Sequence, residues 1–458
     1  MSALWTSQEI AAAVGGTASE NFDVSNVAFD TREVEPGGLF IAMKGERMDG
    51  HDFVAQAFEK GAVGALVDRE MDVPHVRVAD TFAALNDLGR ASRARTQAKI
   101  VGVTGSVGKT GTKEALFAAL DRSARGRAHR SVKSYNNHTG VPLSLARMQR
   151  ETRFGVFEMG MNHKGELSQL TQLVRPHVAI VTAIAPAHRE FFATDADIAD
   201  AKGEIFEGLE PGGTALVPFD SPHRDRLIGH ARPHAGEILT FGFGEGADIR
   251  ATYAIRGANG TMVTASLGDA HLSYTLSQPG DHWVSNSLAV LGAVRAVGGD
   301  LALAGLALAD MPGLKGRGER HDIRVDGGNA LLIDESYNAN PASMAATLRN
   351  FGEEKVAGRR IAVLGAMREL GPESAAFHAA LAEPIAGAGV DQVVLVGDEM
   401  EALAKALGPA VKMAHVGSVA EAADIVRTAM GPGDAILVKG SNSVGLAALV
   451  EALASGMS

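Results

Sequence analysis

A glycine-rich segment at residues 104–110 carries the residue types that bind a nucleoside triphosphate. Its sequence is Thr-Gly-Ser-Val-Gly-Lys-Thr, it follows a β-branched run, and apolar residues recur after it at helical spacing. Lys109 is expected to reach the β- and γ-phosphates and Thr110 to bind Mg²⁺, although Val103 replaces the first glycine of the usual motif. The backbone groups expected to hold the phosphates belong to Gly105, Ser106, Val107 and Gly108. The segment therefore predicts ATP or GTP binding.

Two later apolar runs are followed by side chains that bind metals. Glu158 ends the run that begins at residue 154, and His188 comes four residues after the run 178–184. Ligands bind beyond the carboxyl ends of parallel strands, so both side chains are expected at the edge that holds the phosphate loop. Glu158 is then placed to bind Mg²⁺. His188 is either a structural histidine or a metal ligand, and the repeated pattern favours the ligand.

Three further positions are ambiguous from spacing alone. Lys202 lies in a helix with a surface-like pattern, which predicts an ordinary solvated lysine. His282 and Asn286 are four residues apart at the start of another predicted helix and so share a face. That face either contacts a base or ribose, or is a polar pair at a helix start.

Short apolar runs alternate with helical stretches through most of the chain, which is typical of α/β proteins with parallel sheets. We predict a small mixed α/β domain at 1–84, a central ATPase-like parallel-sheet domain at 85–312, and a Rossmann-like domain at 313–458. A Pro/Gly-rich stretch around residue 312 marks the second boundary. The third domain has no phosphate loop of its own, so ATP is expected to lie between the last two domains.

Composition narrows the function classes. The chain has 458 residues and a formal net charge of −11, which argues against a nucleic-acid-binding surface. It contains no cysteine, which excludes disulfides, thiolate metal sites and a cysteine nucleophile. It shows no secretory signal and no apolar run long enough to span a bilayer. We therefore expect a cytoplasmic protein without membrane insertion.

Together these motifs resemble the Mur ligase family, the ATP-dependent amino-acid and peptide ligases of peptidoglycan synthesis. The matching positions, in order, are residues 104–110, Glu158, His188, Lys202, His282, Asn286, residues 316–319 and Asp334. Segments 29–42 and 334–341 look most like the branch that joins D-alanyl-D-alanine to UDP-N-acetylmuramoyl-tripeptide. The resemblance implies ATP, two Mg²⁺ ions, an acyl-phosphate intermediate and a monomeric enzyme.

The resemblance also implies residue roles. The catalytic set is Lys109, Glu158, His188 and Lys202. Thr110 and Glu158 are expected to bind one Mg²⁺ and His188 a second, beside a carbamylated Lys202. His282 and Asn286 are expected to face adenine, Asp334 the ribose, and Arg317 the phosphates. The implied substrate-binding residues are Asp30, Thr31, Arg32, Phe40, Asn136, Asn137, Tyr337, Asn338, Asn340 and Lys439.

Some positions depart from the family pattern, and other classes stay open. Ala183 stands where the family often has Asn, and Asn442 where this branch often has Arg. On spacing alone, Asp30, Thr31 and Arg32 also fit a solvated turn. A nucleotide-gated switch would share the phosphate loop without needing a second metal. A folylpolyglutamate synthase or another Mur branch would share the central motifs, but not the segments 29–42 and 334–341.

Overall fold

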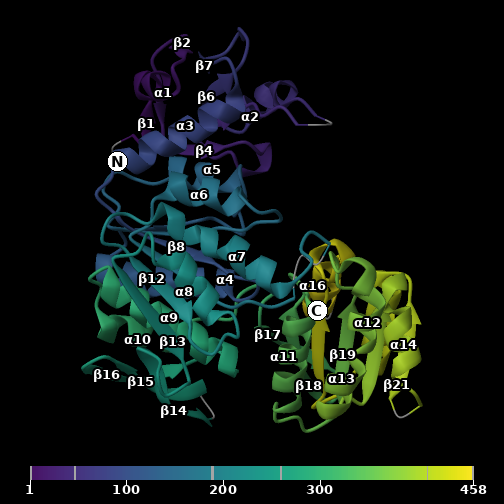
Figure 1. The fold of residues 1–458 in the computed structure, drawn as a ribbon. Helices are drawn as coiled ribbons and strands as arrows, with labels where there is room; N and C mark the ends of the chain where they lie inside the picture. The colour runs from purple at the N-terminus through teal and green to yellow at the C-terminus, as the bar shows by residue number, and fades with distance from the viewer. Residues whose placement is uncertain (1–2, 46–47, 187–189, 258–259, 410, 456–458) are drawn as a thin grey trace.

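The computed structural model describes residues 3–45, 48–186, 190–257, 260–409 and 411–455. Three units follow one another along the chain, each built on its own main sheet (Figure 1). The N-terminal unit lies at one end of the central unit, and the C-terminal unit lies at its side. This confirms the predicted three-unit α/β architecture, while the domain boundaries stay predictions.

The first unit has a five-stranded sheet in the order β2-β7-β6-β5-β4, in which only the β2–β7 pair is antiparallel. The segment between β5 and β6 begins with the 3-10 turn η2 and continues as α2. Helix α3 runs without a break across the predicted boundary at residues 84 and 85. The elements are β1 (Trp5–Thr6), α1 (Ser7–Val14), β2 (Thr17–Ala18), β3 (Asp23–Val24), β4 (Asn26–Ala28), η1 (Thr31–Glu33), β5 (Gly38–Ile41), η2 (Gly50–Phe53), α2 (Val54–Glu59), β6 (Ala62–Val67), β7 (His75–Arg77) and α3 (Thr81–Ala94).

The central unit has a nine-stranded sheet in the order β16-β15-β14-β13-β12-β11-β8-β10-β9. Strands β8 to β14 pair in parallel, and β14, β15 and β16 form an antiparallel edge. The strands are β8 (Lys99–Thr104), β9 (Ala128–Arg130), β10 (Phe154–Glu158), β11 (Val178–Val181), β12 (Thr214–Pro218), β13 (Glu237–Gly242), β14 (Ile249–Gly257), β15 (Gly260–Leu267) and β16 (Ala270–Leu276). The helices are α4 (Lys109–Ala124), α5 (Gly140–Ala146), α6 (Glu166–Val174), α7 (Asp195–Gly203), η3 (Glu204–Gly208), α8 (Arg224–Ala231), α9 (Asp281–Ala296) and α10 (Leu301–Ala309).

Helices cover both faces of this central sheet, which explains its continuous apolar strands. Val101 and Val103 of β8 belong to the core on the side of α4, α9 and α10, whereas Ile100 belongs to the core on the side of α6 and α7. Strand β8 pairs with β10 on one side and β11 on the other. The loops after these three neighbouring strands therefore meet at one edge, where ligands bind in such sheets.

The C-terminal unit has a six-stranded sheet in the order β17-β18-β22-β19-β20-β21, antiparallel only between β17 and β18. One face is covered by α11 to α14 and the other by α15 and α16. The elements are β17 (Glu319–Val325), β18 (Gly328–Glu335), α11 (Pro341–Gly352), β19 (Arg360–Gly365), η4 (Gly371–Glu373), α12 (Ser374–Ala379), α13 (Ala382–Gly387), β20 (Gln392–Val396), η5 (Asp398–Met400), α14 (Glu401–Ala406), β21 (Lys412–Val416), α15 (Val419–Ala429), β22 (Ala435–Lys439), η6 (Asn442–Val444) and α16 (Leu446–Ser455).

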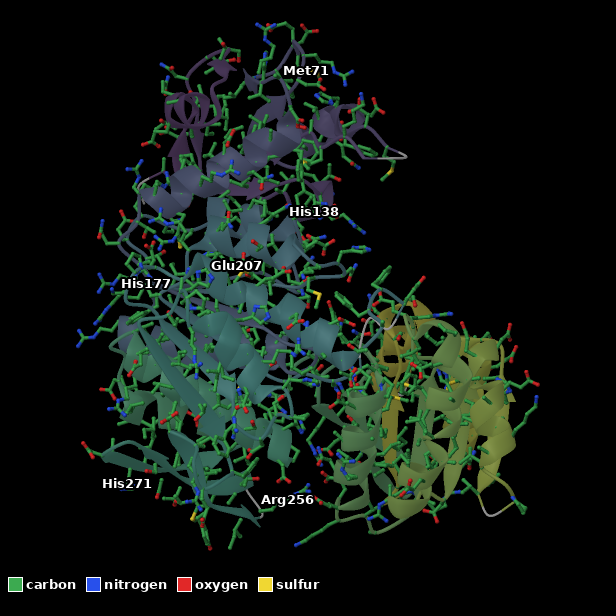
Figure 2. The ribbon with its side chains drawn as sticks, viewed as in Figure 1. Met71, His138, His177, Glu207, Arg256 and His271 are labelled. Carbon is green, nitrogen blue, oxygen red and sulfur yellow. The ribbon has the colours of Figure 1, made fainter. Side chains whose placement is uncertain are left out.

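Ion pairs connect the central and C-terminal units. Arg256 of β14 donates to Glu353 and to Glu354, each at 2.8 Å, and Figure 2 shows Arg256 at the edge of the central unit that faces the C-terminal unit. Within the C-terminal unit, Arg320 of β17 also donates to Glu354, at 2.6 Å. Within the described part of the chain, no helix has the length and apolar character needed to cross a membrane.

Candidate active site

The phosphate-loop segment has the predicted strand, loop and helix structure, with β8 ending at Thr104 and α4 beginning at Lys109. Gly108 has a φ of +85°, a conformation that side chains disfavour. A Cβ atom at Gly108 would lie 3.0 Å from the Asn286 amide of α9. A glycine is therefore needed at this position both for the backbone turn and for the close approach of α9.

The end of β11 holds the phosphate loop in place. The Thr182 hydroxyl donates to the Val107 carbonyl at 2.5 Å, and the Ser106 N–H donates to the Ala183 carbonyl at 2.8 Å. Since Ala183 acts through its backbone, the departure from the family pattern at this position leaves the support of the loop intact. Sequence reasoning missed Thr182 because nothing in its local pattern separates it from other strand threonines.

Lys109 begins α4 and folds back onto its own loop, where its Nζ donates to the Gly105 carbonyl at 2.6 Å. Burial lowers the pKa of Lys109, the charge of Glu158 opposes this shift, and the charge of Arg317 adds to it. Groups from the central and C-terminal units thus act on the same ammonium group. An anion between Lys109 and Arg317 would be attracted by both cations.

The structure brings Thr110 and Glu158 together. Glu158 is 1% exposed, and its Oε2 accepts a hydrogen bond from the Thr110 hydroxyl at 2.9 Å. Its Oε1 accepts one from Asn136 Nδ2 at 2.7 Å. A hydroxyl and a carboxylate next to a phosphate loop supply the oxygen ligands that Mg²⁺ prefers, so these residues fit the expected ion.

A buried lysine that sequence reasoning missed lies behind this pair. Lys113 of α4 is 0% exposed, and its Nζ is 4.0 Å from Glu158 Oε2 and 2.9 Å from Glu114 Oε1. It also donates to the Ser131 and Lys133 carbonyls at 3.1 and 2.6 Å. Polar and apolar residues are not clearly separated on opposite faces of α4, so the burial of Lys113 could not be predicted from its periodicity.

The prediction that Lys202 is a solvated lysine is wrong. The residue is 1% exposed near the end of α7, among buried small neighbours such as Ala201 and Gly203. Small residues leave no apolar stripe, so the periodicity did not reveal the buried face. Burial and then the charge of Lys109 lower the pKa of Lys202 well below its ordinary value. His188, its expected neighbour at the second metal, lies outside the described residues.

The helix α9 presents its predicted face to the site. Asn286 is buried with its amide against the phosphate loop at Gly108. His282, one turn earlier, lines a cavity that also has Trp283 of α9 and Arg320 and Asn350 of the C-terminal unit in its wall. The interpretation as a nucleotide-facing pair is therefore better supported than that of a polar helix start.

Asp334 shapes the turn that carries Arg317. Its Oδ2 accepts from the Gly316 N–H at 2.9 Å, and its Oδ1 accepts from the Ser336 N–H at 3.0 Å. The Arg317 guanidinium lies 4.3 Å from the centroid of the Tyr337 ring. The predicted ribose contact and the predicted phosphate contact are thus parts of one ordered turn.

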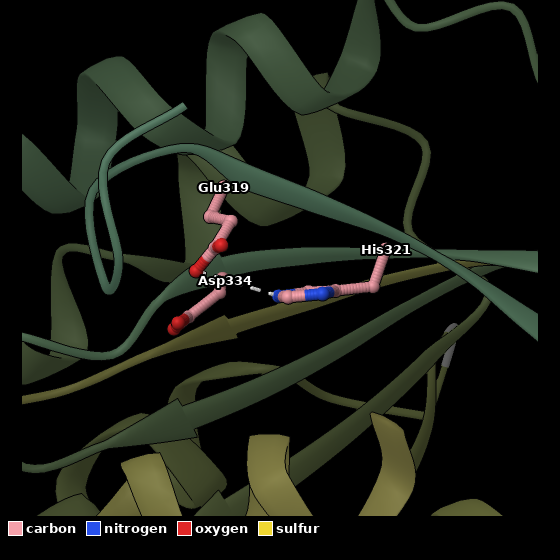
Figure 3. A group of neighbouring side chains, drawn as sticks. All are labelled: Glu319, His321 and Asp334. Carbon is pink, nitrogen blue, oxygen red and sulfur yellow. Dashed lines mark ion pairs between the residues drawn. The ribbon is translucent and has the colours of Figure 1, made fainter. Parts of the chain in front are cut away.

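Two residues lie near Asp334, namely Glu319, which ends the matching segment 316–319, and His321, which sequence reasoning did not single out. Glu319 stands opposite Asp334 in the β17–β18 ladder, and His321 is two residues further along β17 (Figure 3). One ligand atom from each of the three residues lies within 4.8 Å of the others. The Nε2 atom of His321 is 3.6 Å from Glu319 Oε2. Both oxygens of Asp334 are already held by backbone N–H groups, so this group forms the polar surroundings of the predicted ribose contact.

Sequence comparison matches all three units to one family. Residues 23–100 match the Mur ligase catalytic domain, residues 103–294 the Mur ligase middle domain, and residues 316–442 the Mur ligase glutamate ligase domain. The chain is 36% identical to the UDP-N-acetylmuramoyl-tripeptide--D-alanyl-D-alanine ligase of Escherichia coli (strain K12), over 93% of each chain. The chain belongs to the Mur ligase family. As the sequence predicts, it is thereby an ATP-dependent ligase that forms amide bonds.

Other relatives agree with this assignment. The ligase of the same name from Bacillus subtilis (strain 168) is 33% identical over 98% of each chain. A crystal structure of MurF from Acinetobacter baumannii has a TM-score of 0.84 and 31% identity, covering 98% of this chain and 99% of that chain. The structure of a MurF ligase from Thermotoga maritima in complex with ADP has a TM-score of 0.78 and 26% identity, covering 94% and 97%.

In this Mur ligase the predicted substrate-binding residues of the first unit differ from one another in exposure and in hydrogen-bond partners. The Arg32 side chain is exposed and donates to Asp30 at 2.6 Å, and this hydrogen bond lowers the pKa of Asp30 to about 2. The Thr31 hydroxyl donates to Gln56 at 3.0 Å. Phe40 is 1% exposed and packs in the core of the unit, so its predicted contact with the substrate is wrong in this structure.

The remaining predicted substrate residues lie at or near the ends of strands and helices in the central and C-terminal units. Asn137 accepts backbone hydrogen bonds at the start of α5, and Asn340 caps α11, so their side chains already have local roles. Lys439 is buried at the end of β22 and donates to the Asn338 carbonyl at 3.0 Å. Burial lowers the pKa of Lys439. Asn442, which stands where Arg is usual, begins η6.

Proposed function

We propose that this Mur ligase joins D-alanyl-D-alanine to the terminal carboxylate of UDP-N-acetylmuramoyl-tripeptide, with ATP converted to ADP and phosphate. The observation that carries the proposal is the 36% identity, over 93% of both chains, with the Escherichia coli ligase of that name. The site supports it, because a phosphate loop, an oxygen-ligand pair and an arginine from the next unit converge at one edge.

The chemistry follows from the poor electrophilicity of a carboxylate. A carboxylate oxygen attacks the γ-phosphorus of ATP, and ADP leaves with the bonding electron pair, which gives an acyl phosphate. The dipeptide amine then attacks the carbonyl carbon, loses a proton, and phosphate leaves as the amide forms. The enzyme contributes mainly positioning and neutralisation of charge in both steps.

Each residue of the site has a defined role in this proposal. Lys109 turns from the Gly105 carbonyl to the β- and γ-phosphates, and Arg317 approaches the same phosphates from the C-terminal unit. Thr110 and Glu158 would hold Mg²⁺, which neutralises phosphate charge when bound. His282 and Asn286 face the adenine, and Asp334 faces the ribose. The buried Lys439 with Tyr337, Asn338 and Asn340 forms the acceptor side.

We also propose that Lys202 is carbamylated and acts with His188 at a second Mg²⁺. Carbamate formation needs a neutral amine, and both burial and the charge of Lys109 favour the neutral form of Lys202. A carbamate would place negative charge where an ammonium group is disfavoured.

The division of labour among domains is part of the proposal. Residues 1–84, through Asp30, Thr31 and Arg32, bind the UDP end, residues 85–312 bind ATP, and residues 313–458 close over the nucleotide. Asn136 and Asn137 lie between the UDP end and the phosphates. ATP as cosubstrate and the absence of cysteine fit a cytoplasmic enzyme. We propose that it acts as a monomer.

A ligation assay tests the function. The purified chain is incubated with ATP, Mg²⁺, UDP-N-acetylmuramoyl-tripeptide and D-alanyl-D-alanine, and both phosphate release and product mass are measured. We expect phosphate release only when both substrates are present, together with the mass of the UDP-linked pentapeptide. Turnover with a different amino acceptor, or phosphate release that ignores the acceptor, would replace this proposal with another ligase branch or with a nucleotide switch.

A further inference from the structure

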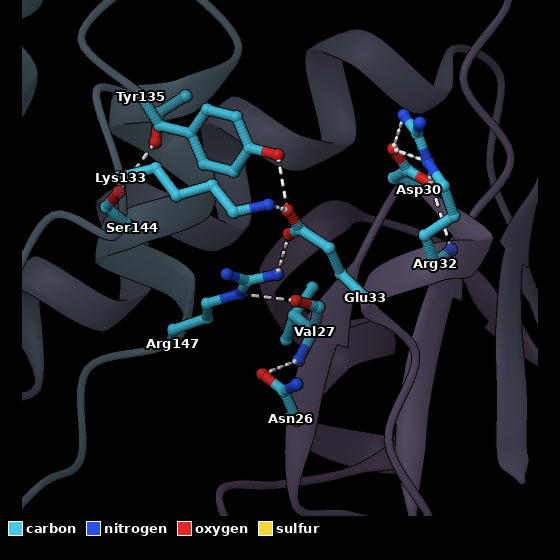
Figure 4. Close-up of polar contacts among 10 residues, drawn as sticks. Asn26, Val27, Asp30, Arg32, Glu33, Lys133, Tyr135, Ser144 and Arg147 are labelled. Carbon is cyan, nitrogen blue, oxygen red and sulfur yellow. Dashed lines mark hydrogen bonds and ion pairs between the residues drawn. The ribbon is translucent and has the colours of Figure 1, made fainter. Parts of the chain in front are cut away.

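Glu33 joins the first unit to the central unit. It is the last residue of η1, next to Arg32. Its Oε1 accepts hydrogen bonds from Lys133 Nζ at 2.5 Å and from the Tyr135 hydroxyl at 2.6 Å, and its Oε2 accepts one from Arg147 at 3.1 Å (Figure 4). Only 14% of its side chain is exposed. Charge-assisted bonds to a partly buried carboxylate hold their geometry better than exposed ion pairs.

The charge states of these groups favour the contact. Burial alone would raise the pKa of Glu33, but the hydrogen bonds from Lys133, Tyr135 and Arg147 outweigh it and hold the pKa below its ordinary value. Burial, followed by the hydrogen bond to Glu33, raises the pKa of Tyr135 to about 12. At neutral pH the carboxylate is therefore ionised and the Tyr135 hydroxyl keeps the proton that it donates.

The segment that contacts Glu33 also contacts the magnesium-binding carboxylate. Asn136 directly follows Tyr135, and its Nδ2 donates to Glu158 Oε1 at 2.7 Å. The Asn136 carbonyl accepts from the Gly160 N–H at 2.7 Å. Upstream, the Ser131 hydroxyl accepts from the Glu158 N–H at 3.2 Å. Residues 131–136 thus lie between Glu33 of the first unit and Glu158 of the central unit.

The backbone of this segment is strained at Lys133, which has a φ of +52°. Non-glycine residues rarely adopt this conformation, and surrounding contacts must hold it. Lys133 is held at both ends, since its Nζ donates to Glu33 and its carbonyl accepts from the buried Lys113 at 2.6 Å. Loss of the Glu33 contact would therefore free a strained residue three positions before Asn136.

We propose that Glu33 is a positioning residue that fixes residues 131–136, so that Asn136 holds Glu158 in the orientation that binds Mg²⁺ with the nucleotide. Glu33 contacts no reacting atom. The first unit thereby sets the affinity of the central unit for Mg²⁺-nucleotide. This inference rests on the proposed function, which assigns Mg²⁺ to Thr110 and Glu158 and the UDP end to the first unit.

Calorimetric titration of ADP, with Mg²⁺ and with EDTA in its place, tests the proposal without any turnover. Residues that orient a metal ligand typically change metal affinity by about 10- to 100-fold. The measured quantity is the ratio of the ADP affinity with Mg²⁺ to the ADP affinity in EDTA. In Glu33→Gln we expect this ratio to be about tenfold smaller than in the wild type, and the ADP affinity in EDTA to be unchanged. Tyr135→Phe, which removes one of the three bonds, is expected to show a smaller change in the same direction.

A matched control and a double mutant separate positioning from a general structural role. Glu35→Gln changes an exposed carboxylate two residues away and is expected to behave as the wild type. If Glu33 acts through Asn136, adding Glu33→Gln to Asn136→Ala should not weaken the Mg²⁺ effect further. Additive losses, or a wild-type Mg²⁺ effect in folded Glu33→Gln, would overturn the proposal. If Glu33→Gln does not fold, the smaller change in Tyr135→Phe decides the question by the same criterion.

The outcomes also distinguish this inference from the proposed function. ADP and Mg²⁺ binding require neither UDP-N-acetylmuramoyl-tripeptide nor D-alanyl-D-alanine. If the wild type makes no pentapeptide but the Mg²⁺ effect on ADP affinity is smaller in Glu33→Gln, the proposed function is contradicted and the positioning role is supported. A chain that makes the pentapeptide, with a Mg²⁺ effect insensitive to Glu33, would do the reverse.

Discussion

The Thr182 hydroxyl donates a 2.5 Å hydrogen bond to the Val107 carbonyl, which links the end of β11 to the middle of the phosphate loop. A side chain on one strand thus supports the loop that follows the neighbouring strand. The two residues are 75 positions apart in the chain. The phosphate loop is therefore positioned by the sheet as well as by its own sequence.

We expect Thr182→Val to raise the KM for ATP several-fold, because the Val107 carbonyl loses its donor and the loop loses a fixed contact. Losing one buried hydrogen bond costs about 1 kcal/mol or more of stability. Thr171→Val is the matched control, since the Thr171 hydroxyl of α6 makes a similar buried bond to the Ile205 carbonyl of η3. Denaturation and ATP kinetics should show equal destabilisation of both variants, but a raised KM only in Thr182→Val. A KM that rises equally in both would refute a specific role of Thr182.

Lys109→Ala should lower the rate of ligation at least about a hundredfold, because a preorganised cation at the transferring phosphate is lost. Lys99→Ala, at the opposite end of β8 and exposed, is the control and should keep the wild-type rate. Steady-state phosphate release measures both. If folded Lys109→Ala retains more than about a tenth of the wild-type rate, worth only about 1.4 kcal/mol, the γ-phosphate lies elsewhere.

Lys202 predicts a specific dependence of stability on pH. Its pKa in the folded protein is well below the ordinary value of 10.5, so between these two values the unfolded chain binds more protons than the folded one. Stability from this group therefore rises with pH across that window and is lowest on the acidic side. Lys202→Met removes this dependence, so its gain in stability over the wild type should be larger at pH 7 than at pH 9. Urea denaturation without CO₂ measures the difference, and a gain that does not change with pH would contradict the lowered pKa of Lys202.

The same variant tests the proposed carbamate. Lys202→Met is expected to lose most ligation activity, and a short carboxylic acid added to Lys202→Ala should restore part of it by occupying the vacated space. Mass analysis of the wild-type protein under CO₂ provides an independent measure. Full activity of Lys202→Ala would return this residue to a structural role.

We expect the ion pairs of Arg256 to hold the central and C-terminal units in their arrangement. Arg320 and Arg256 both hold Glu354, and despite its burial they keep the pKa of Glu354 below its ordinary value. We expect Arg256→Ala to increase the radius of gyration of the ligand-free protein in small-angle scattering. Arg324→Ala, in β17 of the C-terminal unit and without an ion pair to the central unit among the described residues, is the control. An identical radius in wild type and Arg256→Ala would show that these pairs do not hold the units together.

The sequence by itself determined the α/β class, the three successive units and the positions of the chemical motifs. It could do so because glycine spacing, apolar periodicity and the ends of strands are local properties, and residues 104–110 fold as their spacing predicts. His282 and Asn286 lie on one helix, as their spacing predicts, but that spacing left open what their shared face contacts. The rule that ligands bind beyond the carboxyl ends of parallel strands predicted that the loop and Glu158 share one edge.

Only the tertiary structure decided which side chains are buried. Lys113 and Lys202 resemble surface lysines in sequence. The residues next to them in the chain do not show which distant segments pack over their helices. Phe40 could not be separated from a substrate contact for the same reason. Thr182 and Glu33 act across 75 and about 100 positions, respectively, so no local pattern could reveal them. Packing between segments that are distant in the chain sets these contacts and the charge states that depend on them.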